Sequence, residues 1–217
     1  QGRRVGVVAV DPSSAYSGGA ILGDRVRMQV HATDEGVFIR SMASRGHMGG
    51  LARTASDAVD LMDAAGYDPV IIETVGVGQD EIEIARAADV VTVVLVPGMG
   101  DDIQAIKAGI LEIADVFVIN KADRPGADKV AADLDAMMAL TSTTSQPRPP
   151  IFRTVATSGE GVSALRDGLL AYVASTGAEK RAKRRWERAE MRFLGVLTER
   201  FLRDVRARLL PGARFAL

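Results

Sequence analysis

Residues 116–123 read Val-Phe-Val-Ile-Asn-Lys-Ala-Asp, an apolar run that ends abruptly in a polar loop. Near-continuous apolar character is typical of a strand buried on both faces of a sheet. Four more short apolar runs lie at 5–10, 70–72, 90–96 and 151–155. Stretches with helical spacing lie between them, at 50–65, 80–88, 103–114, 127–140 and 162–175. This alternation predicts an α/β fold, a mostly parallel twisted sheet flanked by helices, with ligands at the carboxyl ends of the strands.

The composition excludes several classes of protein. The 217 residues, 47% of them hydrophobic, favour one globular unit with an appendage. There is no cysteine and there are only two histidines, so disulfides, thiol catalysis and transition-metal sites are disfavoured. No apolar run approaches the roughly 20 residues of a membrane helix. We therefore expect a cytoplasmic protein whose partners include neither membrane nor nucleic acid.

The C-terminal part differs in charge from the rest. Residues 179–214 hold twelve Lys or Arg against five Asp or Glu, whereas residues 1–178 hold fifteen against twenty-three. An apolar residue recurs at every fourth position of this part, at Phe193, Leu197, Phe201, Val205 and Leu209. This spacing predicts a long basic helix with one apolar stripe. A solvated face, a dimer or partner surface and a nucleic-acid arm are the alternatives for this helix, and the apolar stripe favours the second. Because the charge balance changes here, we divide the chain into residues 1–176 and 177–217.

The polar end of the opening stretch has the form Asn-Lys-x-Asp. A carboxylate at Asp123 can accept hydrogen bonds from the ring N–H and the exocyclic amine of guanine, a donor pair that adenine lacks. Asn120 would tie the loop to the base and Lys121 would lie along its face. After the run 151–155, the backbone at Thr157 and Ser158 could contact the guanine carbonyl oxygen. A solvated turn is the alternative, but the placement at a strand end favours guanine recognition.

Three carboxylates at strand ends or adjoining loops predict a magnesium and phosphate site. Glu73 could hold the magnesium shell or orient a water, and Gly76 would let its backbone N–H approach a γ-phosphate. Asp11 and Asp24 are hard oxygen donors suited to magnesium. Each has a simpler alternative, since Asp before Pro forms turns, Asp caps helices and glycines turn the chain into a helix. We predict one Mg–GTP site, with Glu73 and Gly76 as catalytic candidates.

A glycine-containing loop at 96–107 is a candidate switch. A strand opens there into a loop with glycine on both sides of Met99 and then into a helix, so the loop could change shape between nucleotide states. An ordinary strand-to-helix connection is the alternative. The candidate switch residues are Gly98, Gly100, Asp101, Asp102, Gln104 and Lys107. In the expected loop 40–50, Arg40, Arg45 and His47 could face phosphates or a partner.

A phosphate-binding loop of the form Gly-x-x-x-x-Gly-Lys-[Ser/Thr] would complete such a site, since its amides cradle the phosphates. No Gly-Lys pair occurs in residues 1–217. Such a loop follows a first strand and opens a first helix, so we expect all three elements upstream of Gln1.

Six runs together resemble the MeaB/ArgK family of P-loop GTPases. They are Val-Asp-Pro-Ser-Ser (10–14), Ser-Gly-Gly-Ala-Ile-Leu-Gly-Asp-Arg (17–25), Arg-Gly-His-Met-Gly-Gly (45–50), Glu-Thr-Val-Gly-Val-Gly-Gln (73–79), Gly-Asp-Asp-Ile-Gln-Ala-Ile-Lys-Ala-Gly (100–109) and Asn-Lys-Ala-Asp (120–123). The family belongs to the metallochaperone class associated with methylmalonyl-CoA mutase, and some members are named as transport kinases.

The resemblance implies a P-loop G domain with a C-terminal helical extension, GTP or GDP and Mg²⁺ as ligands, and a homodimer to which the C-terminal helices contribute. It implies that Asp11, Asp24 and Glu73 line the magnesium site and that residues 120–123 bind guanine. It also implies slow GTP hydrolysis that gates cobalamin loading and protection of methylmalonyl-CoA mutase or a related cobalamin-dependent acyl-CoA mutase. The alternatives are a truncated non-catalytic binding module and a transport-associated kinase or ATPase. GTPase activity is expected of the parent protein and is uncertain for this chain alone.

Overall fold

A computed structural model describes the chain in segments. These are residues 3–11, 28–31, 33–43, 50–74, 82, 84–85, 88–98, 111, 113–141, 148–176 and 178–209. Contacts divide the chain into two compact units, Gln1–Ser175 and Thr176–Leu217, and each is described by itself. The first unit contains two three-stranded parallel sheets, so the expected α/β class with parallel strands is confirmed.

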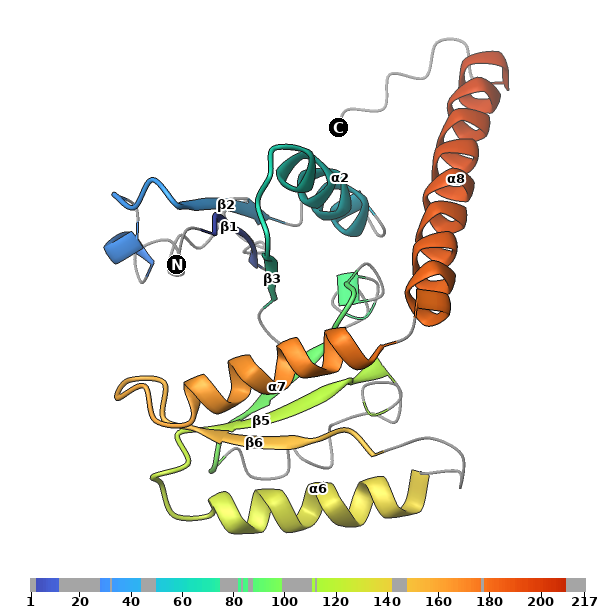
Figure 1. Cartoon of the computed structure of the whole chain (residues 1–217). Helices are drawn as coiled ribbons and strands as arrows, with labels where there is room; N and C mark the ends of the chain where they lie inside the picture. Colours follow the sequence, from blue (N-terminus) through green and yellow to red (C-terminus); the bar gives the residue numbers. More distant parts are fainter. Residues whose placement is uncertain are drawn as a thin grey trace. The chain divides into compact units, whose positions relative to one another are not determined.

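The first sheet has the order β2-β1-β3, formed by β2 (Val37–Ala43), β1 (Val5–Asp11) and β3 (Val70–Thr74). Helix α2 (Gly50–Ala64) packs on one face of this sheet (Figure 1). There Ala55 and Met62 of α2 meet Val8 and Val10 of β1 in a buried cluster. At Gly6 an added Cβ would stand only 2.7 Å from the sulfur of Met62. Glycine at this position therefore lets α2 approach the strand closely. A short 3-10 helix, η1 (Gln29–His31), lies between β1 and β2 in sequence.

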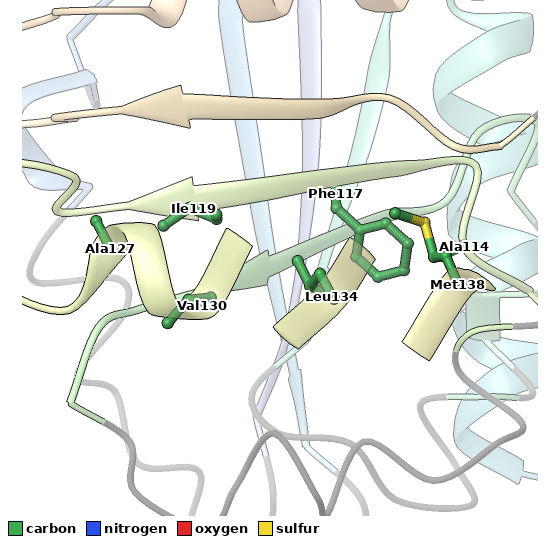
Figure 2. Close-up of a cluster of buried hydrophobic side chains, with 7 residues drawn as sticks. All are labelled: Ala114, Phe117, Ile119, Ala127, Val130, Leu134 and Met138. Atoms are coloured by element: carbon green, nitrogen blue, oxygen red, sulfur yellow. The ribbon is translucent and has the colours of Figure 1, made fainter. Parts of the chain in front are cut away.

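The second sheet has the order β4-β5-β6, formed by β4 (Thr92–Leu95), β5 (Val116–Asn120) and β6 (Ile151–Thr154). Helix α6 (Ala127–Thr141) covers one face of β5. Figure 2 shows the resulting core, to which β5 contributes Phe117 and Ile119 and α6 contributes Leu134. These three side chains have no exposed surface. The central strand β5 is thus fully buried apart from its last residue, as its apolar run predicts.

Helix α7 (Val162–Ser175) packs on the opposite face of this sheet. Phe152 pairs with Val118, whose side chain points away from the α6 face because side chains alternate along a strand. A Cβ on Gly168 of α7 would stand 2.1 Å from the Phe152 ring, so the helix lies directly against it. Figure 1 shows α6 and α7 on either side of β5 and β6. At the start of β5, the buried Asp115 accepts hydrogen bonds from the Val91 N–H (2.9 Å) and the Tyr172 hydroxyl, which ties α7 to the sheet.

The second unit contains α8 (Ala178–Leu209), a helix of 32 residues. Its large apolar side chains are exposed, among them Phe193 at 62%, Leu197 at 47% and Phe201 at 67%. The expected long basic helix is therefore present. Neither α8 nor any other helix in the described segments is long and apolar enough to cross a membrane.

The structure corrects one expectation and shifts others. Residues 40–43 belong to strand β2, so the expected loop at 40–50 begins too early and Arg40 lies in a strand. The first sheet gains a third strand because 37–43 pairs along β1, a contact between segments about 30 residues apart. The expected strand at 90–96 is shorter, at Thr92–Leu95. Most of the expected helix at 103–114 lies outside the described residues.

Candidate functional site

The carboxyl end of β5 is joined to the loop after β6 through Asn120. The side-chain oxygen of Asn120 accepts a hydrogen bond from the Thr154 hydroxyl (3.2 Å) and another from the Ala156 N–H (3.1 Å). The Thr154 side chain is buried, at 4% exposure, so its hydroxyl is shielded from competing water. These two bonds hold the Asn-Lys-x-Asp loop against the loop that follows β6.

The loop after Asn120 turns sharply at Lys121. Its φ of 55° lies in the left-handed region, which non-glycine residues seldom adopt and which is often found at functional sites. The turn is closed by bonds from the Ala122 N–H to the Thr154 carbonyl (3.1 Å) and from the Arg124 N–H to the Lys121 carbonyl (2.9 Å). Lys121 and Asp123 are both exposed. The carboxylate that would read a base is therefore accessible and carried by a fixed backbone.

The loop after β6 is also fixed by backbone hydrogen bonds. The Val155 N–H donates to the Glu160 carbonyl (2.9 Å), and the Val155 carbonyl accepts from both the N–H and the hydroxyl of Ser158 (3.1 Å each). Gly161 has a φ of +73°, and a Cβ there would stand 2.0 Å from the Arg153 carbonyl oxygen, so only glycine fits. The Ser158 donors are used inside the turn and the Ala156 N–H is bonded to Asn120, so the exposed Thr157 is the residue that this loop presents.

Glu73 lies one residue before the end of β3. Its register partner is Ala9, and Ala9 in turn pairs with Ser41 of β2, so these three residues form one row across the sheet. The row belongs to the face opposite α2, because Val8 and Val10 point toward that helix. Ser41 and Glu73 each have a buried side-chain oxygen. The row thus places two polar groups near the carboxyl end of the first sheet.

The remaining candidates are described only in part. Asp11 ends β1 and pairs through its backbone with Ala43, while its side chain lies outside the described residues. Gly98, after β4, is exposed with a φ of +91°, and an added Cβ would meet nothing within 4 Å. Outside the described residues lie Asp24, Gly76, Gly100, Asp101, Asp102, Gln104 and Lys107. Within the described segments, no cluster of three or more acidic or histidine residues suits a metal ion.

The family model described as methylmalonyl Co-A mutase-associated GTPase MeaB matches residues 1–209. The chain belongs to the MeaB family. A Pyrococcus abyssi protein that carries a GTPase description is 54% identical over 170 residues, which are 77% of this chain and 52% of that protein. The mouse methylmalonic aciduria type A homolog, mitochondrial, is 42% identical over 171 residues, covering 77% of this chain and 41% of its own length. The chain thus spans about half the length of these relatives.

The fold agrees with that membership in the MeaB family. A crystal structure of LAO/AO transport system kinase superimposes with a TM-score of 0.71 at 27% identity, covering 95% of this chain and 62% of that one. The resemblance noted in the sequence is therefore confirmed at the level of family and fold. A GTPase family implies guanine nucleotide binding, and the assignment of individual site residues stays a prediction.

The structure brings together the base-reading candidates of this MeaB-family chain and adds two residues to them. Asn120, Lys121, Asp123, Thr157 and Ser158 lie on two loops joined by direct hydrogen bonds. Sequence reasoning missed Thr154 and Ala156, which hold Asn120. The only signal in the sequence was a threonine at the end of the last apolar run, and nothing local links it to Asn120, 34 positions earlier.

Proposed function

We propose that this chain supplies the guanine-recognition part of a GTP-binding, slowly hydrolysing protein that gates cobalamin loading and protection of an acyl-CoA mutase. The family membership supports the nucleotide and the GTPase class, and the two joined loops support the base. The bond between the Ala156 N–H and the Asn120 side chain carries the proposal. It joins the two loops, and base recognition requires loops that are held in place.

The residues present fit a guanine base. Asp123 is an exposed carboxylate on a fixed turn, and a carboxylate acceptor selects the paired donors of guanine over adenine. Bound magnesium would neutralise charge on the phosphates, and Asp11, Asp24 and Glu73 are proposed to hold it. Glu73 and Gly76 are proposed at the γ-phosphate. The loop from Gly98 to Lys107 is proposed to respond to nucleotide state.

Both described sheets have an edge at which a phosphate-binding strand would fit. Among the described strands, β3 pairs only with β1 and β4 pairs only with β5. Parallel strands seldom stay exposed at an edge when they are this apolar, and Ile71 of β3 and Val94 of β4 are about half exposed. We propose that a strand, phosphate loop and helix from outside residues 1–217 complete the G domain. A chain without them would be the non-catalytic binding module kept as the alternative.

The partner is proposed from the relatives. The matching family model is described as methylmalonyl Co-A mutase-associated, so methylmalonyl-CoA mutase or a related cobalamin-dependent mutase is the proposed partner. The exposed apolar side of α8 supports a homodimer, because a stripe of this kind gains free energy when a second surface covers it. The cytoplasmic location stays a prediction.

Calorimetric titration with GDP and ADP tests the base assignment, using both residues 1–217 and the longer parent polypeptide. We expect the parent to bind GDP and not ADP, and Asp123→Ala to weaken GDP binding at least about 100-fold, because two charge-assisted hydrogen bonds are lost. Asp135→Ala, at an exposed position on α6, is the matched control and should leave affinity unchanged. Equal affinity of the parent for ADP and GDP would refute guanine recognition. Absence of GDP binding by residues 1–217 alone would support the non-catalytic module for this stretch.

The transport-kinase alternative comes from the family resemblance, and the superimposing structure carries the name of a transport system kinase. Incubation of the parent polypeptide with labelled GTP separates the two activities. When the label is on the γ-phosphate, a GTPase releases it as inorganic phosphate, whereas a kinase transfers it to an acceptor. We expect free phosphate.

A further inference from the structure

A buried hydroxyl group near the carboxyl end of the first sheet lacks a hydrogen bond. It belongs to Ser41 of strand β2, whose Oγ makes no hydrogen bond to any residue that the structure describes. Most buried polar side chains in proteins are hydrogen-bonded, because a buried hydroxyl loses its bonds to water. An alanine at this position would avoid that cost. The stability of the chain therefore does not account for a serine here.

Ser41 points away from helix α2. Its neighbours in β2, Arg40 and Met42, line a groove of about 500 Å³ between this strand and α2, and side chains alternate along a strand. The Ser41 side chain therefore lies on the opposite face, in the row that also holds Ala9 and Glu73. This row lies one or two residues before the ends of the three strands, and ligands of parallel α/β sheets bind beyond those ends.

A single methyl group separates Ser41 from Glu73 in this row. It belongs to Ala9, which is fully buried. Neighbouring strands lie about 4.8 Å apart, so the backbones of Ser41 and Glu73 are about 10 Å apart. A glutamate side chain can lean across a methyl group, and one ordered water can span the distance that remains. Because Glu73 has a buried carboxylate oxygen, the Ser41 hydroxyl can donate to it directly or through one water.

We propose that Ser41 is a positioning residue for Glu73, and that its hydroxyl restrains the carboxylate for GTP hydrolysis. The inference rests on the proposed function, in which Glu73 acts at the γ-phosphate, and adds the residue that orients it. Hydrolysis joins water to the γ-phosphorus and breaks its bond to the β-phosphate oxygen, giving GDP, phosphate and a proton. Catalysis of this reaction depends mainly on positioned groups. The predicted base-reading residues lie on the loops after β5 and β6, so GDP affinity should not depend on Ser41.

Steady-state GTP hydrolysis by the longer parent polypeptide tests the positioning with two variants of equal shape. Ser41→Thr keeps a hydroxyl, whereas Ser41→Val has a methyl group in its place. We expect kcat of Ser41→Val to be at least about tenfold below that of Ser41→Thr, with KM and GDP affinity equal within about twofold. Thr54→Val is the matched control, because it makes the same exchange at an exposed α2 residue that lines the groove on the other face. It should leave kcat unchanged.

Urea unfolding of Ser41→Ala separates positioning from a structural role. This variant introduces no additional atoms, so it also covers the case in which a larger side chain does not fit at this position. Removal of a hydroxyl that stabilises the fold would lower the midpoint of unfolding, whereas removal of an unsatisfied one would not. We expect Ser41→Ala to unfold at the same urea concentration as the wild type or at a higher one, while its kcat falls about tenfold. A lower midpoint with unchanged kcat would overturn the inference.

Combination with Glu73→Gln identifies the residue through which Ser41 acts. With the carboxylate replaced by an amide, Ser41→Ala should change kcat by less than about twofold, because residues that act through one another are not additive. A full tenfold loss in this background, or equal kcat values for Ser41→Thr and Ser41→Val, would overturn the inference and leave the proposed GTPase intact. Wild-type kcat in Glu73→Gln would overturn the roles of both residues without affecting guanine binding. A parent polypeptide that hydrolyses no GTP would refute the proposed hydrolysis together with this inference.

Discussion

The two three-stranded sheets of this protein differ in how completely their own chain covers them. In the sheet β4-β5-β6, helices on both faces bury the central strand, and Phe117, Ile119 and Leu134 have no exposed surface. In the sheet β2-β1-β3, one described helix covers one face, and Phe38 and Ile71 remain about half exposed. The first arrangement joins the loops after β5 and β6, which carry the predicted base-reading residues. The second leaves apolar surface, and at its β3 edge we propose that a strand from outside residues 1–217 binds.

The largest expected difference in stability between the two sheets comes from truncating one phenylalanine in each of them. Phe117→Ala removes a fully buried ring and should cost about 3–5 kcal/mol of the free energy of unfolding. Phe38→Ala removes a ring that is 45% exposed and should cost about 1 kcal/mol in the monomer. Urea unfolding of both variants at low protein concentration measures the difference. Equal costs would show that the β2 edge is as fully packed as β5.

A smaller effect is expected at two glycines of the loop after β6. Gly161→Ala places a Cβ 2.0 Å from a backbone oxygen at a positive φ, and should cost about 2–4 kcal/mol of folding free energy. Gly159→Ala has a similar φ of +80° but no atom within 4 Å of the new Cβ, so it should cost only about 1 kcal/mol. The same unfolding measurement separates steric fit from backbone preference. If both variants lost the same stability, the close contact with the Arg153 carbonyl would be unimportant.

A stability effect as small as that at Gly159 is expected at Thr154, where nucleotide binding should respond more than folding. Thr154→Val removes the hydroxyl that bonds Asn120 and should cost about 1 kcal/mol of stability. In the parent polypeptide it should weaken GDP binding several-fold, because the Asn-Lys-x-Asp loop loses one of its restraints. Thr154→Ser keeps the hydroxyl and should restore affinity. GDP titration of both variants checks this, and equal affinities would remove Thr154 from the positioning of the loop.

Much of the fold could be predicted from hydrophobic pattern. The run 116–119 predicts a strand buried on both faces, and β5 has that burial. The same pattern at 70–72 and 90–96 gives strands whose Ile71 and Val94 are about half exposed, because burial depends on neighbours that the pattern does not contain. Strand β2 was missed because Arg40 and Ser41 interrupt its apolar residues. An edge strand tolerates such residues, since one side of it is open.

The candidate site, like the fold, could be predicted from the sequence only in part. The residue types that are predicted to select guanine are adjacent in sequence, at 120–123, so that prediction could be made locally. The register that puts Ser41, Ala9 and Glu73 in one row joins three strands and could not be inferred. Strand pairing of this kind is set by long-range packing, which no short segment encodes.

The sequence by itself determined the class of fold, the family resemblance and the carboxylate at Asp123, because each depends on residue type and local spacing. Only the tertiary structure decided that Thr154 and Ala156 hold Asn120 and that α2 leaves a groove beside β2. The bonds to Asn120 depend on the parallel pairing of β5 with β6, which joins residues more than 30 positions apart. The groove depends on the position at which α2 packs on its sheet. Both follow from packing of distant segments, whose free energy a local pattern does not reveal.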